Sequence, residues 1–187
     1  MLELLEKSAK LIAEGKIRAI ALSNETVWGT AKWLSLAATH GLPRMASVQN
    51  EYSLLCRQFD TDWAELSVME DVPLLAFSPI ACGILSGKYQ GDVIPPGSRR
   101  SLNPVLSGRV TPRTFTVTQE YLNIASRHGL NPCQMAIAFT KTRPFHTIPI
   151  VGATSIAQLA TNLGQITLSP EVLAEIAATH LAHPQPY

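Results

Sequence analysis

Apolar and polar positions along the chain follow two different patterns, and each pattern predicts a type of secondary structure. Residues 2–13 place leucine, alanine and isoleucine at helical spacing, and Gly15 follows as a helix stop. Residues 74–77 form a short continuous apolar run ended by Ser78 and Pro79, which is typical of a buried strand. The same reading predicts helices over 2–13, 26–40, 59–69, 117–128, 132–142, 155–163 and 170–180, and strands over 17–22, 45–49, 74–77 and 147–151.

The order of these elements predicts an α/β fold. Strands without polar alternation, separated by amphipathic helices, are typical of a parallel sheet covered by helices. Glycines and prolines punctuate residues 90–115, which we expect to form a long irregular loop after the third strand. A closed (β/α)₈ barrel usually needs about 250 residues, so four β/α units supply about half of one. We therefore expect residues 1–187 to form a single partial barrel domain.

Composition narrows the class of protein. The chain has 187 residues, of which 46% are hydrophobic and 16% charged, as in a globular domain. A net charge of +1 argues against nucleic acid or an anionic membrane as a general partner. The three cysteines are scattered and form no CxxC pair, so we expect a reducing cytoplasm and no metal site. Neither a signal peptide nor a run of roughly 18 apolar residues is evident, so we expect no membrane partner.

Polar side chains follow the first two predicted strands. Ser23 and Asn24 come directly after the first strand, and Gln49 begins the most polar part of the stretch 47–52. Because the carboxyl ends of the strands form the functional face of α/β barrels, these positions are candidates for ligand binding, and Gln49 could reach a bound amide. Two structural alternatives remain. Serine and asparagine are also good N-caps, and residues 47–52 can form an ordinary loop.

The third predicted strand ends in Phe77, followed by the small residues of 78–87 and by Lys88. A flat side chain, a small-residue turn and a cation together suit a planar ligand ring that carries phosphate. Small residues allow backbone N–H groups to approach phosphate closely. An ordinary glycine-containing turn is the structural alternative.

The fourth predicted strand leads into Gly152 and a hydroxyl-rich turn that opens a short helix, with Gln158 and Asn162 on one face. A helix N-terminus favours an anion, and barrel phosphate sites commonly follow the seventh and eighth strands. Capping by Thr154 or Ser155 is the alternative. Taken together, the four strand ends predict a surface for a long ligand with a planar ring, a pyrophosphate and a further phosphate.

These stretches resemble, in order, the aldo/keto reductase superfamily over about residues 4–180. Residues 15–24 and 49–54 resemble its fifth and sixth strands, and residues 78–89 resemble its seventh-strand loop, notably in the potassium-channel β-subunit branch. Residues 152–162 are similar to its adenosine-phosphate end, and residues 127–136 resemble the bacterial Tas-like reductases. The resemblance implies the C-terminal half of a (β/α)₈ TIM barrel that uses NADP(H) to reduce an aldehyde or ketone.

The resemblance also implies a cofactor role for each strand end. Positive charge from Lys88 and Arg99 would bind phosphate and favour NADP over NAD. The other implied contacts are Ser23, Asn24 and Gln49 with the nicotinamide carboxamide, Phe77 with its ring, Ser78, Pro79, Ile80, Ala81, Cys82 and Gly83 with the pyrophosphate, and Gly152, Thr154, Gln158 and Asn162 with the adenosine end.

The family's proton donor is a tyrosine supported by lysine, aspartate and histidine, all from the first four β/α units. The chain begins in the helix after the fourth strand, so we expect no catalytic residue in it and a small carbonyl substrate only for the complete enzyme. Two alternatives remain: a catalytically inactive nucleotide-binding or regulatory module, and a truncated gene remnant. Open sheet edges predict self-association.

Overall fold

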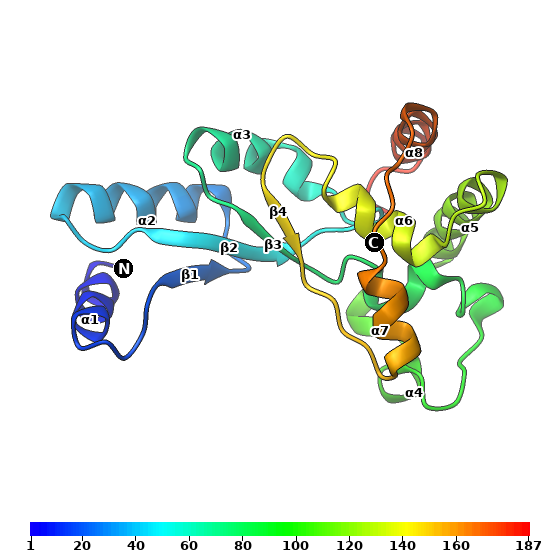
Figure 1. Ribbon diagram of the computed structural model, residues 1–187, viewed down its shortest axis with the longest axis horizontal. Helices are drawn as coiled ribbons and strands as arrows, with labels where there is room; N and C mark the ends of the chain where they lie inside the picture. Colours follow the sequence, from blue (N-terminus) through cyan, green and yellow to red (C-terminus); the bar gives the residue numbers. More distant parts are fainter. The chain divides into compact units, whose positions relative to one another are not determined.

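The computed structural model describes residues 1–187 and alternates helices with strands (Figure 1). The strands are β1 (Ile20–Ser23), β2 (Met45–Glu51), β3 (Leu74–Phe77) and β4 (Thr147–Pro149). The helices are α1 (Leu2–Ala13), α2 (Val27–His40), α3 (Asp62–Met69), α4 (Arg99–Leu102), α5 (Pro112–Arg127), α6 (Pro132–Thr140), α7 (Ile156–Leu163) and α8 (Pro170–Ala182). Short 3₁₀ turns are η1 (Gln58–Asp60), η2 (Ala81–Ser86), η3 (Gln90–Asp92) and η4 (Leu106–Gly108). None of the helices is both long and apolar enough to cross a bilayer.

The strands form one four-stranded sheet in the order β1-β2-β3-β4. β1 and β2 are parallel: Ile20 pairs with Met45, an irregularity follows, and Leu22 and Ser23 then pair with Val48 and Gln49. Ile150 lies beyond the end of β4, and its N–H donates to the Ala76 carbonyl at 2.8 Å. The predicted α/β architecture of four parallel strands with helices is confirmed.

Most predicted boundaries agree with the structure, and the exceptions have local causes. α1 and β3 have the predicted bounds. α5 begins earlier than predicted because Thr111 caps it and a proline occupies its first turn, where apolar periodicity is weak. Residues 90–111, within the segment predicted to be irregular, contain η3, α4 and η4.

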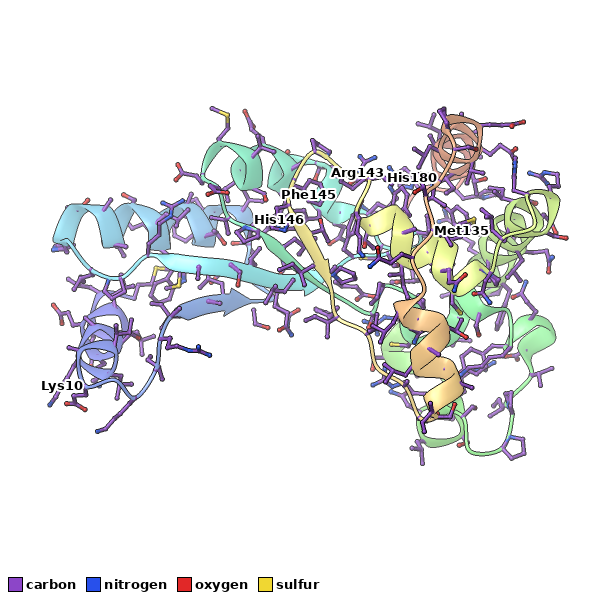
Figure 2. All side chains as sticks on the ribbon, viewed as in Figure 1. Lys10, Met135, Arg143, Phe145, His146 and His180 are labelled. Carbon is purple, nitrogen blue, oxygen red and sulfur yellow. The ribbon has the colours of Figure 1, made fainter.

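The chain divides into two compact units, of which the first comprises Met1–Asn50, Phe59–Leu75 and Pro144–Ile148. Within it α2 packs against α1 and α3. Phe59 anchors an aromatic cluster, with ring centroids 5.0 Å from Trp63 and 4.8 Å from Phe145, the residue labelled ahead of β4 in Figure 2. The other fully or nearly fully buried apolar side chains of this unit include Leu5, Trp33, Leu34, Val48, Val72 and Leu74.

The second unit comprises Glu51–Gln58, Ala76–Arg143 and Pro149–Tyr187. Within it α5 packs against α6, α8 and η2, and α6 packs against α7. Tyr52 and Phe139 stack with centroids 6.1 Å apart. Two further tyrosines, Tyr89 and Tyr121, are each 1% exposed. The core of this unit therefore contains phenol groups, whose hydroxyls need partners.

The two buried tyrosines differ in that respect. The Tyr121 hydroxyl donates to the Leu54 carbonyl at 3.1 Å, and burial raises the pKa of Tyr121 to about 12. The Tyr89 hydroxyl has no hydrogen-bond partner. An unpaired buried hydroxyl has lost its hydrogen bonds to water without replacing them. The Tyr121 hydroxyl should therefore stabilise the fold, and the Tyr89 hydroxyl should not.

Replacing each tyrosine by phenylalanine tests this difference. We expect Y121F to lower the free energy of unfolding by about 1–2 kcal/mol, because it leaves the Leu54 carbonyl unpaired. Y89F is the matched control and should be neutral or stabilising. Urea unfolding followed by circular dichroism measures both. Equal losses in the two variants would contradict the assignment.

Candidate functional site

The ends of β1 and β2 bring three of the predicted site residues together in the first unit. Ser23 is the register partner of Gln49, and the Asn24 N–H donates to the Gln49 carbonyl at 2.9 Å. Asn24 has a left-handed backbone with φ of +51°, which asparagine tolerates better than most residues. Ser23 and Asn24 are exposed, and Gln49 is partly exposed. Their side chains are thus accessible at the carboxyl ends of β1 and β2.

The structure excludes helix capping as the role of Ser23 and Asn24. The N-cap of α2 is Thr26, whose hydroxyl accepts from the Gly29 N–H at 3.0 Å. Ser23 and Asn24 therefore do not cap this helix, and capping does not explain why they are polar.

Two neighbouring residues that sequence reasoning left without a role hold this turn in place. The Asn50 side-chain amide donates to the Glu25 carbonyl at 3.1 Å. The Glu25 carboxylate accepts from the Thr26 N–H at 2.9 Å and from the Trp33 indole at 3.2 Å. The one available signal was that Asn50 belongs to the polar stretch 47–52; its partner lies 25 residues earlier.

The loop after β3 has a strained backbone. Ser78, Ala81 and Cys82 all have left-handed backbones, with φ of +54°, +48° and +57°, and Gly83 follows at +93°. Left-handed conformations of non-glycine residues cost energy and concentrate at ligand sites, where successive backbone N–H groups can form anion-binding concavities. Among the predicted residues, Pro79, Ala81 and Gly83 are buried, and Phe77, Ser78, Ile80 and Cys82 are partly exposed. An ordinary glycine turn does not require three strained non-glycine residues.

Two cations lie close to this loop within the second unit. Lys88 folds back over Gly83, so that a methyl group added there would be 3.0 Å from the lysine Cε. Arg99, at the start of α4, places Nη1 3.5 Å from the Cys82 sulfur. The Cys82 sulfur is also 3.5 Å from the Ser78 hydroxyl. Positive charge beside a turn rich in backbone N–H groups favours an anion.

The segment after β4 brings the last predicted residues together. The Thr154 N–H and hydroxyl donate to the Gln158 side-chain oxygen at 3.1 and 3.0 Å. The buried Asn162 amide donates to the Gly152 carbonyl at 3.1 Å. Ser155 is the N-cap of α7, so the capping alternative holds for Ser155 and not for Thr154. Gly152, Thr154 and Gln158 remain exposed.

A partly buried ion pair joins the end of β2 to the loop before α5. Arg109 donates from Nε to the Glu51 carboxylate at 2.8 Å, and the Tyr187 hydroxyl donates to the same carboxylate at 3.0 Å. The hydrogen bond to Glu51 raises the pKa of Arg109, and burial followed by the Glu51 charge raises the pKa of Tyr187. Burial and then Glu51 also raise the pKa of the Cys56 thiol to about 11. A catalytic acid needs a pKa near the working pH, so Tyr187 is tuned away from that role.

A separate cluster lies between the end of α5 and α8. His128, Glu171 and Glu175 bring one ligand atom each to within 4.8 Å of one another. Arg127 and His128 already pair with the Glu175 carboxylate and lower its pKa. We assign no metal to this cluster, because Arg127 already pairs with the Glu175 carboxylate, one of the three possible ligands.

The chain is similar to several known proteins over nearly its whole length. The chain is 42% identical to protein Tas of Escherichia coli (strain K12) over 188 aligned residues, covering all of this chain and 54% of that protein. It is 30% identical to a protein of Schizosaccharomyces pombe that carries the name "Putative voltage-gated potassium channel subunit beta", covering 94% of this chain and 54% of the relative. The chain thus spans about half the length of the curated relatives it matches.

A solved structure and a family profile complete the comparison. The glycerol dehydrogenase of Gluconobacter oxydans superposes with a TM-score of 0.71 at 21% identity, over 95% of this chain and 53% of that one, which supports the predicted half-barrel fold. The profile described as "Aldo/keto reductase family" matches residues 1–180. With the ordered strand-end motifs already in place, this match confirms the resemblance: the chain belongs to the aldo/keto reductase family.

Proposed function

We propose that the strand-end loops bind NADP(H), and that the chain supplies the cofactor-binding half of an oxidoreductase. The bound nicotinamide would exchange a hydride with the carbonyl carbon of an aldehyde or ketone. The observation that carries the proposal is the strained loop 78–83 with Lys88 and Arg99 beside it. Such a loop fits the phosphates of a dinucleotide and has no evident structural purpose.

The residues of the first unit suit the nicotinamide end. Ser23, Asn24 and Gln49 present hydroxyl and amide groups at one sheet edge. A carboxamide both donates and accepts hydrogen bonds, so side-chain amides and hydroxyls can pair with it fully. Phe77, in the second unit, is half-buried and leaves part of its ring accessible for stacking. In this role these groups would orient the nicotinamide for transfer.

The residues of the second unit suit the phosphates and the adenosine. Ser78, Ile80, Ala81, Cys82 and Gly83, with Pro79 shaping the turn, would line the pyrophosphate. The Ala81 and Gly83 N–H groups already donate to the Ser78 and Ile80 carbonyls, at 2.7 and 2.9 Å, and so hold the shape of the turn. Selectivity for NADP(H) over NAD(H) would come from charge-assisted contacts of Lys88 and Arg99 with the 2′-phosphate, because NAD(H) lacks that group and shares the pyrophosphate. The exposed groups of Gly152, Thr154 and Gln158 would meet the adenosine end, and Asn162 would hold the turn through the Gly152 carbonyl.

A second candidate function is a nucleotide-binding or regulatory module without turnover. Two observations favour it for the chain by itself. The pKa values of Tyr121 and Tyr187 are raised, which opposes proton donation at neutral pH. One relative carries the name of a channel subunit. In either case the cofactor binds to the same loops.

Titration with NADPH tests the proposal and separates the candidates. We expect the chain to quench or shift NADPH fluorescence, and K88A to weaken binding about tenfold because a charge-assisted phosphate contact is lost. K141A removes another exposed lysine of the second unit and should leave binding unchanged. NADPH oxidation with simple aldehydes, followed at the same time, separates binding without turnover from an active reductase. A folded chain that does not bind NADPH would contradict the proposal.

The shape of the loop can be tested at Gly83. G83A should weaken NADPH binding at least as much as K88A, because the added methyl would meet Lys88 as well as an unfavourable backbone. G91A is the matched control, since Gly91 also has a positive φ, +71°, but has open space around it. A loss of affinity as large in G91A would show that backbone strain alone accounts for the effect.

We also propose a cytoplasmic location and self-association of the chain through its sheet edges. All three cysteines are free, as expected in a reducing compartment. β1 and β4 are the edge strands, and Ile148 of β4 is 48% exposed. Unpaired edges promote association, which an edge lysine opposes. Sedimentation velocity should detect oligomers that decrease in I148K; a wild-type monomer at high concentration would contradict this part.

A further inference from the structure

Two adjacent arginines at the start of α4 have opposite environments. Arg99 is exposed, with its Nη1 beside the Cys82 sulfur, whereas Arg100 is only 3% exposed. Successive residues of a helix point about 100° apart, so one of the pair can face the cofactor loop while the other faces inward. The proposed function uses Arg99 and leaves the buried Arg100 without a role.

We propose that Arg100 is a positioning residue that sets the preference for NADP(H) over NAD(H) by holding Arg99 beside loop 78–83, where its guanidinium would reach the 2′-phosphate, the one group that NADP(H) has and NAD(H) lacks. This inference rests on the proposed function. It goes further because it assigns selectivity to a side chain that does not contact the cofactor.

The Arg100 guanidinium is hydrogen-bonded along each of its edges. Its Nε donates to the Pro104 carbonyl at 3.0 Å, its Nη1 to the Val93 carbonyl at 3.1 Å, and its Nη2 to the Asp92 carboxylate at 2.7 Å. These acceptors lie on both sides of α4 in the sequence, so one side chain closes residues 92–104 into a single loop. Only arginine offers donors in such a planar fork, and lysine cannot reproduce the three bonds.

Two aromatic rings pack near the same guanidinium. Its central carbon is 5.6 Å from the centre of the Tyr89 ring and 5.8 Å from that of Phe115. Tyr89 follows Lys88, and Lys88 Nζ is itself 5.0 Å from the Tyr89 ring centre. Arg100 therefore ties the α4 loop to the segment that carries the other proposed phosphate cation.

The loop needs this anchor because its own helix is too short to be stable. α4 has four residues, and isolated helices below roughly 12 residues are marginal in water. Val93, Leu102 and Val105 are exposed and contribute little burial. Without the Arg100 contacts, the loop would open locally, and Arg99 would sample many positions instead of one.

The experiment measures NADPH and NADH affinities of the wild-type chain and of R99Q, R100Q and the double variant. We expect R100Q to weaken NADPH binding about tenfold and NADH binding less than about twofold. This difference is the selectivity that disappears when one charge-assisted contact is lost. R99Q should show the same selectivity loss, and R99Q/R100Q should lose no more than R99Q alone, because the two residues act as one unit. R113Q, at another exposed arginine of the second unit, is the matched control.

Two further measurements separate a positioning role from general destabilisation. Hydrogen exchange of the cofactor-free chain should rise over residues 92–104 in R100Q and R100K and remain unchanged in the core of α5. D92N keeps an acceptor oxygen for Arg100 but removes the negative charge, at an exposed position, and should weaken NADPH binding about threefold even if R100Q fails to fold.

The outcomes distinguish this inference from the proposed function. A folded wild-type chain that binds no NADPH overturns both. Wild-type binding that R99Q leaves unchanged overturns the role of Arg99 and, with it, the positioning role. Normal NADPH-to-NADH selectivity in R100Q or D92N, equal losses for both cofactors, or additive losses in the double variant overturn the inference about Arg100 alone.

Discussion

The register of the parallel strands determines which residues of this chain leave the sheet at its carboxyl edge. Pairing of Ser23 with Gln49 brings a hydroxyl and an amide to the same level of two neighbouring strands. The backbone bond from Asn24 to Gln49 then fixes the turn that follows. A register shift of one residue would move every side chain of a strand to the other face. Apolar side chains such as Leu22 and Val48, which are buried on one face, prevent that shift. The hydrophobic core and the candidate site therefore depend on one constraint.

Two arginines, one buried and one partly buried, organise the second unit in a complementary way. Arg109 binds the Glu51 carboxylate, and Arg100 joins three acceptors around α4. Both residues lie in a segment with little regular structure, where few backbone bonds define the path of the chain. A guanidinium with several acceptors replaces those missing bonds. The same segment presents Arg99 to the strained loop after β3. The buried Arg100 and the exposed Arg99 thus combine a rigid anchor and an accessible cation in two adjacent residues.

The sequence was most informative where the determining interactions are local. Leu2–Ala13 and Leu74–Phe77 have the predicted bounds because period and stop signals lie within the segments themselves. The first turn of α5 was missed because its polar residues carry no apolar period. The strand-end residues could be proposed from polar positions after apolar runs. The supporting residues could not: Asn50 acts on a partner 25 residues away and Arg109 on one 58 residues away. For Arg100, the sequence could not indicate which of two adjacent arginines is buried.

Chemical-shift mapping shows whether the strand-end loops form a dinucleotide-phosphate site. A 20.3 kDa chain is suited to amide spectra of an isotope-labelled sample titrated with NADP⁺. We expect saturable shifts grouped at residues 23–25, 49–50, 78–88, 99–100 and 152–162, with α1 and α8 unaffected. Shifts that spread over α1 or α8, or the absence of saturable shifts from a well-dispersed spectrum, would contradict it.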